Sequence, residues 1–445
     1  MAENRLDIYA DAKSISCVQN DKISDKLFRE YGVFTGLRDE NGKGVLTGLT
    51  RISEVKSFAD GADGKPEPCD GELWYRGYNV NTLLSKYIGK NEFGFERMTY
   101  LLLFGELPSS EQEAEFKSII GDCRILPSNF TRDVIMKAPT GDIMNSMSRS
   151  ILALAAYDTS TGKNDVANTI KQCIKLISLF PSLAVYAYHA YNHYINDDSM
   201  YIHRPDPSLS AAENLLMMLR PNKKYSFIEA KVLDTALILH MEHGGGNNST
   251  FTTRVVTSSG SDAYSTMAAA MSSLKGPKHG GANIKVMEMM NDIKQHVNDI
   301  TSREEVSDYL HKIVNKEAFD GKGLIYGMGH AVYTVSDPRE RILKEYVKKL
   351  SADKHKDDEM TLYGLVEELA PSIIEEKRRT HKAISPNVDF YSGFVYDMLG
   401  IPKEMYTAIF AIARIVGWSA HRLEELICTD KIIRPAYMSV MKEKE

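Results

Sequence analysis

The stretch from residue 240 to residue 283 concentrates side chains that can exchange protons. It holds three histidines, His240, His243 and His279, together with two glycine clusters and a run of Asn, Ser and Thr. Glycine lets the backbone approach a ligand closely or adopt a positive φ, and a histidine beside it can give or take a proton near neutral pH. The alternative is a glycine-rich turn with a surface histidine nearby, and this stretch alone does not decide between the two.

Further segments carry other candidate catalytic or binding groups. GLIYGMGHAVYTVSDPRE holds His330, and it holds Arg339 directly after Asp-Pro, where a helix is expected to begin. Asp389 in SPNVDFYSG stands between two apolar residues, which would desolvate its carboxylate, raise its pKa and make it a stronger base. Arg414 interrupts the apolar segment AIARIVGWSAH, and Arg434 follows in IIRPAY near the C-terminus.

Each of these residues also has a structural explanation. His330 could cap a turn, Asp389 could be a carboxylate at a helix N-terminus, and Arg414 could reach solvent along its aliphatic stem or pair with a core acid. Taken together, however, several histidines, one carboxylate in apolar surroundings and three arginines suit one task. Arginine binds both oxygens of a carboxylate with its planar fork, so the set is typical of a site that binds a small polycarboxylate and moves protons on carbon.

Helices must position most of these residues, because apolar side chains recur with a spacing near 3.6 over most of the chain. This periodicity predicts a mostly α fold. From residue 261 onward, this helical pattern covers residues 261–275, 284–297, 303–317, 337–351, 358–379 and 403–428.

Local signals refine this pattern. Residues 44–79 are rich in Gly, Thr and Val around a turn-like insert and predict a small pair of strands. GELPSS separates two helices, the second of which Ser109 or Ser110 could cap. Pro181 predicts a kink or a break in a long helix, and the charged residues 351–360 predict an exposed loop.

Length and composition set the broad class. A chain of 445 residues exceeds one typical core and predicts two domains. With 54 Lys and Arg against 60 Asp and Glu, the net charge of −6 argues against a general nucleic-acid binder, though not against an anionic substrate in a locally basic cleft. The apolar run around Arg414 is short for a membrane span and contains that charge, which favours a buried helix.

Several common signatures are missing from the sequence. The five cysteines are scattered and never spaced CxxC, which argues against a disulfide framework or zinc knuckle and favours a reducing cytoplasm. The N-terminus lacks the apolar segment of a secretory signal. Dinucleotide, P-loop and zinc-protease sites lack their usual motifs. The histidines are separated by glycine turns and have no acids at ligand spacing, so we expect no metal site.

Four segments resemble the citrate synthase family in order and rough spacing: GPKHGGAN (276–283), GMGHAVYTVSDPR (327–339), PNVDFYSG (386–393) and ARIVGW (413–418). LILHMEH, ELWYRGY and IIRPAY are similar to further family segments, so the resemblance covers nearly the whole chain. It implies a two-domain helical fold with a small N-terminal β element. It also implies the condensation of acetyl-CoA with oxaloacetate and hydrolysis of the citryl thioester to citrate and CoA, an acyltransferase reaction of the tricarboxylic acid cycle that needs no cofactor.

The resemblance implies roles for individual residues. His279 matches the histidine that hydrogen-bonds the thioester carbonyl of acetyl-CoA, Asp389 the base that removes the methyl proton, and His330 the histidine that polarises the keto carbonyl of oxaloacetate. The residues matched to groups that hold the carboxylates of oxaloacetate and citrate are His243, Arg339, Arg414 and Arg434. The loop matched to the one that cradles the adenine of CoA contributes Lys322, Leu324, Ile325, Tyr326, Gly327, Met328 and Gly329.

The family pattern also predicts domains and partners. Residues 1–280 would form the first part of a large α domain, residues 281–388 a small mobile α domain, and residues 389–445 the rest of the large domain. Arg434 would reach the active site from the partner subunit, which implies a homodimer and leaves a higher oligomer open. Neither nucleic acid nor membrane is an expected partner.

Alternative activities remain open on the sequence. A 2-methylcitrate synthase would use propionyl-CoA with the same catalytic residues, and one methylene provides only about 1–3 kcal/mol of discrimination. A non-catalytic helical scaffold or ligand sensor would keep the fold without turnover, against which the complete set of His279, His330 and Asp389 argues. A lyase that cleaves citrate would need a further energy source, and the sequence has no nucleotide-binding motif to supply one. The N-terminal 40 residues match the family poorly, which leaves inhibition by NADH open.

Overall fold

The first 49 residues form a unit separate from the rest of the chain. This unit holds α1 (Ala2–Asp21), α2 (Asp25–Glu30) and the 3-10 turn η1 (Thr35–Leu37). Ser24 caps α2 by accepting a hydrogen bond from the amide of Lys26. None of the described side chains in this unit is buried. The computed structural model of the chain describes residues 2–39, 44–60, 66–89, 91–329, 332–333, 335–378 and 384–441.

The second unit, residues 50–445, begins with a small antiparallel sheet. Its strands, in spatial order, are β1 (Ser53–Asp60), β2 (Pro66–Tyr75) and β3 (Tyr78–Asn79). Arg76 and Gly77 connect β2 to β3, and their φ angles of 50° and 86° are those of a two-residue type I′ hairpin turn. The strand pair predicted within residues 44–79 is confirmed, and a short third strand extends it.

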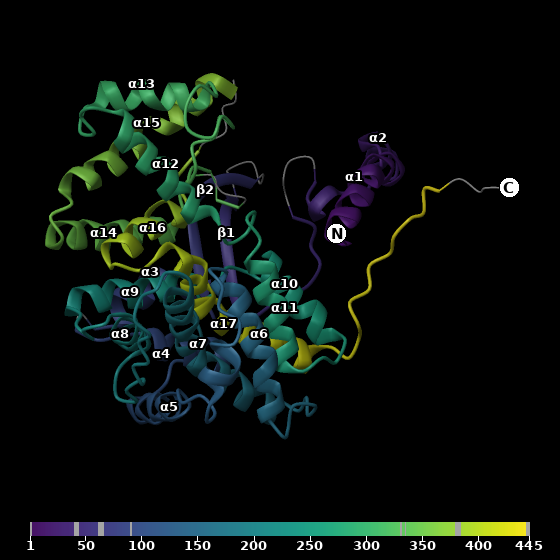
Figure 1. The fold of residues 1–445 in the computed structure, drawn as a ribbon, viewed down its shortest axis with the longest axis vertical. Helices are drawn as coiled ribbons and strands as arrows, with labels where there is room; N and C mark the ends of the chain where they lie inside the picture. Colours follow the sequence, from purple (N-terminus) through teal and green to yellow (C-terminus); the bar gives the residue numbers. More distant parts are fainter. Residues whose placement is uncertain are drawn as a thin grey trace. The chain divides into compact units, whose positions relative to one another are not determined.

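Helices build the remainder of this unit (Figure 1). They are α3 (Val80–Thr82), α4 (Phe95–Phe104), α5 (Ser110–Asp122), α6 (Ile143–Leu154), α7 (Val166–Ile195), α8 (Ala211–Leu219), α9 (Phe227–His240), α10 (Asn248–Ser258), α11 (Ala263–Leu274), α12 (Ala282–His296), α13 (Arg303–Val314), α14 (Pro338–Asp353), α15 (Asp357–Arg378), α16 (Val388–Met398) and α17 (Tyr406–Cys428). The predicted mostly α class is confirmed. Ser109, rather than Ser110, caps α5 and forms a reciprocal capping box with Gln112.

Two local predictions need correction. α7 continues through Pro181, so the predicted break is wrong; both flanks of the proline are buried, and this packing outweighs the lost backbone hydrogen bond. Residues 351–360 are mostly helical rather than a loop, because α14 runs to Asp353 and α15 begins at Asp357. Acidic residues at the start of a helix are favoured by its dipole, which explains why this charged stretch can be helical.

Two long helices dominate the core of the second unit. α7 is long and apolar enough to cross a membrane by length and composition, but 83% of its most apolar window is buried inside the protein, as in a core helix. α17 packs against α7, α9 and α10, and its buried residues include Arg414, Trp418 and His421. A helix that is buried on nearly all sides can hold polar groups only where they have a function or a partner.

Candidate active site

The last residue of α9 is His240, and the turn that follows the helix carries His243. Carbonyl groups at a helix end have no partner within the helix. The hydroxyl of Tyr75 donates to the carbonyl of Ile238 at 2.9 Å. Nε of Arg414 donates to the carbonyl of His240 at 2.7 Å. Both donor side chains are buried, so the turn is held from β2 on one side and from α17 on the other.

Glu242, in the same turn, is fully buried and anchors it further. Its Oε1 accepts hydrogen bonds from Oγ of Ser53 and Nε2 of His421, each at 2.9 Å. Arg254 donates to Nδ1 of His421 at 2.6 Å, and because arginine only donates, the ring proton of His421 lies on Nε2. Burial raises the pKa of Glu242, but the contact with His421 and the charge of Arg414 outweigh it and lower the pKa below its usual range.

His279 lies in the segment between α11 and α12, where its ring contacts the start of α10. Its Nε2 is 3.0 Å from Oγ of Ser249 and 3.4 Å from the amide nitrogen of the same residue. The indole N–H of Trp418 donates to this Oγ at 3.2 Å. Because an amide nitrogen only donates, its contact favours the tautomer in which Nε2 accepts. The proton of His279 is then on Nδ1, where it can be donated to a ligand.

The imidazole of His279 is uncharged at neutral pH. Burial, together with the positive charge of Arg414, lowers its pKa to about 4. A neutral imidazole can donate a hydrogen bond from Nδ1 throughout the physiological pH range, which suits the stabilisation of a developing oxyanion.

Asp389 is the second residue of α16. Asn387 caps this helix, because its Oδ1 accepts from the amide of Asp389 at 3.0 Å. Burial raises the pKa of the Asp389 carboxyl to about 6, although the charge of Arg339 acts in the opposite direction. The carboxylate is therefore a stronger base than an exposed aspartate, as its apolar sequence neighbours predicted.

The segment before His330 runs beside the segment before Asp389. Nδ2 of Asn387 donates to the carbonyl of Gly329 at 2.9 Å, and the amide of Asn387 donates to the carbonyl of Gly327, also at 2.9 Å. Gly327 has a φ of 82°, and a Cβ there would lie 2.8 Å from the ring of Phe390, so the bend requires glycine. His330 itself lies outside the described residues.

Arg339, the second residue of α14, is held by Asp337, which caps the helix. Nε and Nη2 of Arg339 donate to the two carboxylate oxygens of Asp337 at 3.0 and 2.7 Å. Asp337 is fully buried and also accepts from the amide of Val388 at 3.2 Å, which joins the start of α14 to the start of α16. Burial lowers the pKa of Arg339, but the charge of Asp337 outweighs it and raises the pKa.

Arg414 is equally buried but is held differently. Its guanidinium carbon lies 4.6 Å from the ring centroid of Phe410, and its hydrogen bond to the carbonyl of His240 uses Nε alone. Within the part of the chain that the structure describes, no carboxylate pairs with its two terminal nitrogens. Burial lowers the pKa of Arg414 to about 10, so it remains charged at neutral pH. Its fork is thus available for a carboxylate.

The structure brings five of the predicted site residues together. The ring of His243 and the guanidinium of Arg339 both lie against Tyr333. The charge of Arg414 acts on both His279 and Asp389. The charge of Arg339 also acts on Asp389, which connects the two groups of residues.

Other predicted residues lie elsewhere. Arg434 is exposed, in the chain that follows α17. Lys322 is also exposed, and its Nζ lies 3.9 Å from a carboxylate oxygen of Asp320. In the predicted CoA loop, Ile325 and Gly327 are buried, whereas the exposed fraction of Leu324 is 39%. Thus the monomer places neither Arg434 nor Lys322 beside the five residues.

His240 packs inside the protein. It is 1% exposed, and its ring centroid lies 4.7 Å from that of Phe410. Burial, together with the charges of Arg339 and Arg414, lowers the pKa of His240 well below its usual value. Neither ring nitrogen of His240 has a hydrogen-bond partner among the described residues, so the ring packs as a neutral imidazole.

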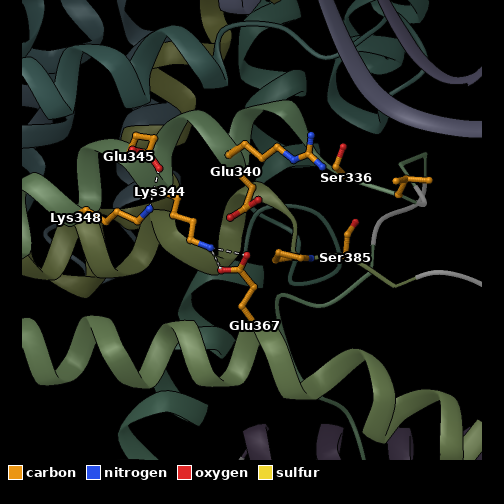
Figure 2. A pocket seen from close by; sticks show the side chains of 10 residues that line it. Ser336, Glu340, Lys344, Glu345, Lys348, Glu367 and Ser385 are labelled. Carbon is orange, nitrogen blue, oxygen red and sulfur yellow. Dashed lines mark hydrogen bonds and ion pairs between the residues drawn. The ribbon is translucent and has the colours of Figure 1, made fainter. Parts of the chain in front are cut away.

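A cavity of about 460 Å³ borders the site (Figure 2). Figure 2 shows Glu340 beside the ion pair in which Lys344 contacts both carboxylate oxygens of Glu367 at 2.7 Å. Burial raises the pKa of Glu340 to about 8, and the charge of Glu367 contributes. Ser336 and Ser385, at the far side, directly precede the segments that hold Asp337 and Asn387. The cavity therefore adjoins the candidate site without containing its catalytic side chains.

Sequence reasoning missed the residues that orient the predicted groups. Asp337 and Asn387 are helix caps, and their positions just before a helical pattern are a signal that could have found them. Ser249, Trp418 and Glu242 carry no such local signal, because their partners lie far away in the sequence.

Comparison with known proteins identifies the fold. The sequence model described as "Citrate synthase, C-terminal domain" matches residues 37–436. The chain belongs to the citrate synthase family. A citrate synthase of Synechocystis sp. is 34% identical over 395 residues, which cover 88% of this chain and 90% of the relative. A 2-methylcitrate synthase of Shewanella oneidensis is 33% identical over 408 residues, which cover 90% of this chain and 95% of the relative.

The structural comparison agrees. The citrate synthase of Thermoplasma acidophilum, solved as a ternary complex with carboxymethyl coenzyme A and oxaloacetate, matches with a TM-score of 0.74 at 27% sequence identity. The match covers 90% of this chain and 96% of that one. The resemblance to the citrate synthase family and the helical class predicted from the sequence are both confirmed.

Proposed function

We propose that the protein condenses acetyl-CoA with oxaloacetate and hydrolyses the citryl thioester to citrate and CoA, an acyltransferase reaction. The observation that carries this proposal is that the charge of Arg414 acts both on a neutral histidine, His279, and on a carboxylate of raised pKa, Asp389. The similar structure from Thermoplasma acidophilum was solved with carboxymethyl coenzyme A and oxaloacetate, which supports these substrates.

Enolisation comes first. The methyl group of a thioester is a very weak acid, so the oxygen that becomes negative must be stabilised as the proton leaves. Nδ1–H of His279 donates to that oxygen, and one such donor contributes about 10²–10³ in rate. The carboxylate of Asp389 takes the methyl proton, and positioned proton transfer contributes about 10²–10⁴.

Carbon–carbon bond formation follows. The former methyl carbon attacks the keto carbon of oxaloacetate, and the keto oxygen takes up a proton to become the hydroxyl of citrate. His330 polarises this carbonyl, while His243, Arg339 and Arg414 bind the carboxylates of oxaloacetate. Water then attacks the thioester carbonyl, and CoA leaves as the thiol. These residues need no metal or redox group for any step.

Closure of a small domain would exclude water during these steps. We place this domain at residues 281–388, between large-domain parts at 1–280 and 389–445. In Figure 1, α12, α13 and α15 gather at one end of the second unit, away from α4 and α5, which supports this division. The loop from Lys322 to Gly329 would then hold the adenine of CoA through its backbone.

Arg434 completes the site of a partner subunit in this proposal. It lies in a tail without helix or strand among the described residues up to 441, and the exposed fraction of Tyr437 in that tail is 96%. An exposed tail of this kind can gain stability by covering a second copy. The functional unit would therefore be a homodimer.

The test is thiol release from acetyl-CoA and from propionyl-CoA, each with and without oxaloacetate. We expect oxaloacetate-dependent release and a higher kcat/KM with acetyl-CoA. A higher kcat/KM with propionyl-CoA would instead identify a 2-methylcitrate synthase, which the similar Shewanella oneidensis relative makes the second candidate. Absence of release with both thioesters would establish a non-catalytic protein. Repeating the assay with NADH tests for inhibition.

A further inference from the structure

Tyr333 lies between two groups of the proposed carboxylate pocket. Its residue is 1% exposed. Its ring centroid is 5.4 Å from that of His243, and the two rings meet edge to face at 73°. The guanidinium carbon of Arg339 lies over the same ring, 5.9 Å from its centroid. An aromatic face attracts a guanidinium, and edge-to-face contact between rings is favourable, so one ring supports both groups.

The ring of Tyr333 is itself fixed by β2. A Cβ on Gly71 would lie 2.5 and 2.8 Å from Cδ1 and Cε1 of Tyr333, and 2.2 Å from the carbonyl oxygen of Ser336. Gly71 therefore allows the ring to rest directly on the backbone of the strand. The hydroxyl of Tyr333 donates to the carbonyl of Glu72 at 3.5 Å, a long contact compared with the ring packing.

This arrangement connects segments that are far apart in the sequence. His243 follows α9, Arg339 begins α14, and Gly71 belongs to β2. Arg339 is oriented from its other side by Asp337, which occupies two of its nitrogens. Tyr333 supplies the flat surface that sets how far the guanidinium can move from the imidazole.

We propose that Tyr333 is a positioning residue that holds His243 and Arg339 at the separation needed to bind one substrate carboxylate together. The proposal rests on the proposed function for the identity of that substrate, oxaloacetate. The ring contacts of Tyr333 described above are made to His243 and Arg339, two groups proposed to bind a carboxylate, and not to groups proposed to transfer the methyl proton. Removal of the ring should therefore weaken the binding of oxaloacetate and leave the proton transfer nearly unchanged.

The decisive comparison uses Tyr333→Leu and Tyr333→Phe. The Kd of oxaloacetate is measured by calorimetry without acyl-CoA, and kcat and KM are measured by thiol release. A cation–π contact of a buried arginine corresponds to a change of about tenfold in affinity. We expect Tyr333→Leu to raise both Kd and KM for oxaloacetate about tenfold, with kcat within about twofold of the wild type. Tyr333→Phe keeps the ring and should bind as the wild type does.

Tyr309→Leu is the control, because Tyr309 is another tyrosine of low exposure, 8%, in α13, where its hydroxyl donates to Asp292 at 2.7 Å. It should leave the Kd of oxaloacetate unchanged even if it lowers the melting temperature. If Tyr333→Leu does not fold, Gly71→Ala replaces it as the test. The added methyl group pushes the ring of Tyr333 away from β2, and this variant should raise the Kd of oxaloacetate.

Three results would overturn the proposal. These are an unchanged Kd in folded Tyr333→Leu, a loss of kcat without a change in Kd, or an equal defect in Tyr333→Phe, which would assign the effect to the hydroxyl. The proposed function fails separately: wild-type protein that binds oxaloacetate but releases no thiol would refute the condensation while leaving the positioning role of Tyr333 intact.

Discussion

The two buried arginines of the proposed carboxylate pocket are held in opposite ways. Arg339, at the start of α14, donates to both oxygens of Asp337 through Nε and Nη2. Arg414, in the middle of α17, uses Nε to bind the carbonyl of His240, and no described carboxylate occupies its terminal nitrogens. Arg339 therefore stabilises the fold and belongs to the proposed pocket, whereas the terminal nitrogens of Arg414 remain available to bind a substrate carboxylate.

The helices around the two arginines are also held together in different ways. The wall formed by the end of α9, by α10 and by α17 is fixed by side chains, such as the series from Arg254 through His421 to Glu242. The wall formed by the starts of α14 and α16 is joined mainly through Asp337 and Asn387, two helix caps. The first wall is held by side chains from several helices, while the second depends on two caps at helix starts.

The largest expected effect concerns the base on the second wall. Asp389→Asn keeps the shape of the side chain but removes the carboxylate that we propose accepts the methyl proton. We expect kcat to fall by about 10²–10⁴, with the Kd of oxaloacetate within about threefold of the wild type, because the arginines are untouched. A comparable loss of oxaloacetate affinity would show instead that Asp389 acts in binding. Thiol release and calorimetry measure the two quantities.

The pH profile of the wild type provides the control for this prediction. The pKa of Asp389 is raised to about 6, so the carboxylate is the base above this pH and is protonated below it. The value of kcat/KM should therefore fall as the pH drops through about 6. The pKa of His279, about 4, lies too low to contribute a second step in this range. A profile that is flat between pH 5 and 7 would contradict the assignment.

The next prediction separates the two arginines directly. Arg339→Ala leaves Asp337 buried without its counter-charge, so it should cost about 3–5 kcal/mol of unfolding free energy in addition to substrate binding. Arg414 makes no hydrogen bond to a carboxylate among the described residues, so Arg414→Ala does not deprive a buried acid of its hydrogen-bond partner. It should therefore cost less stability but weaken oxaloacetate binding about 10–100-fold. Chemical denaturation and calorimetry distinguish the two profiles.

Arg422→Ala is the control for a buried arginine outside the site. Arg422 also lies in α17, where its Nη1 donates to the hydroxyls of Thr257 and Thr266. Its loss should reduce stability and leave the Kd of oxaloacetate unchanged. Equal stability losses for Arg339→Ala and Arg414→Ala would remove the distinction between an arginine that stabilises the fold and one that is available to bind a substrate carboxylate.

Much of this arrangement could be predicted from the sequence, because it depends on short segments. The helical class follows from a local periodicity, and His279, Asp389, Arg339 and Arg414 stand in recognisable motifs. The prediction failed where burial outweighed a local signal. Pro181 does not break α7, because both of its flanks are packed inside the protein.

Long-range partners were beyond the reach of the sequence. Nothing near Ser249 indicates that it meets His279 and Trp418, since these contacts exist only after α10 and α17 have packed together. The same holds for Gly71, whose close approach to Tyr333 is a property of the folded sheet. Residue types in a motif can indicate chemistry, whereas the tautomer and orientation of a catalytic group depend on neighbours that only the fold supplies.

The smallest expected effect tests the first wall through such a neighbour. Ser249→Ala removes the Oγ that lies 3.0 Å from Nε2 of His279 and that accepts from Trp418. The amide of residue 249 still favours the tautomer with the proton on Nδ1, so the variant should remain active. Loss of one neutral hydrogen bond corresponds to about a three- to tenfold decrease in kcat, with the KM for oxaloacetate unchanged.

Ser272→Ala, which removes a hydroxyl bonded only to the carbonyl of Ala268 among the described residues, is the control and should retain the full kcat. If Ser249→Ala instead raised KM without lowering kcat, Ser249 would support the carboxylate pocket, and the first wall would not be the one that orients the thioester donor.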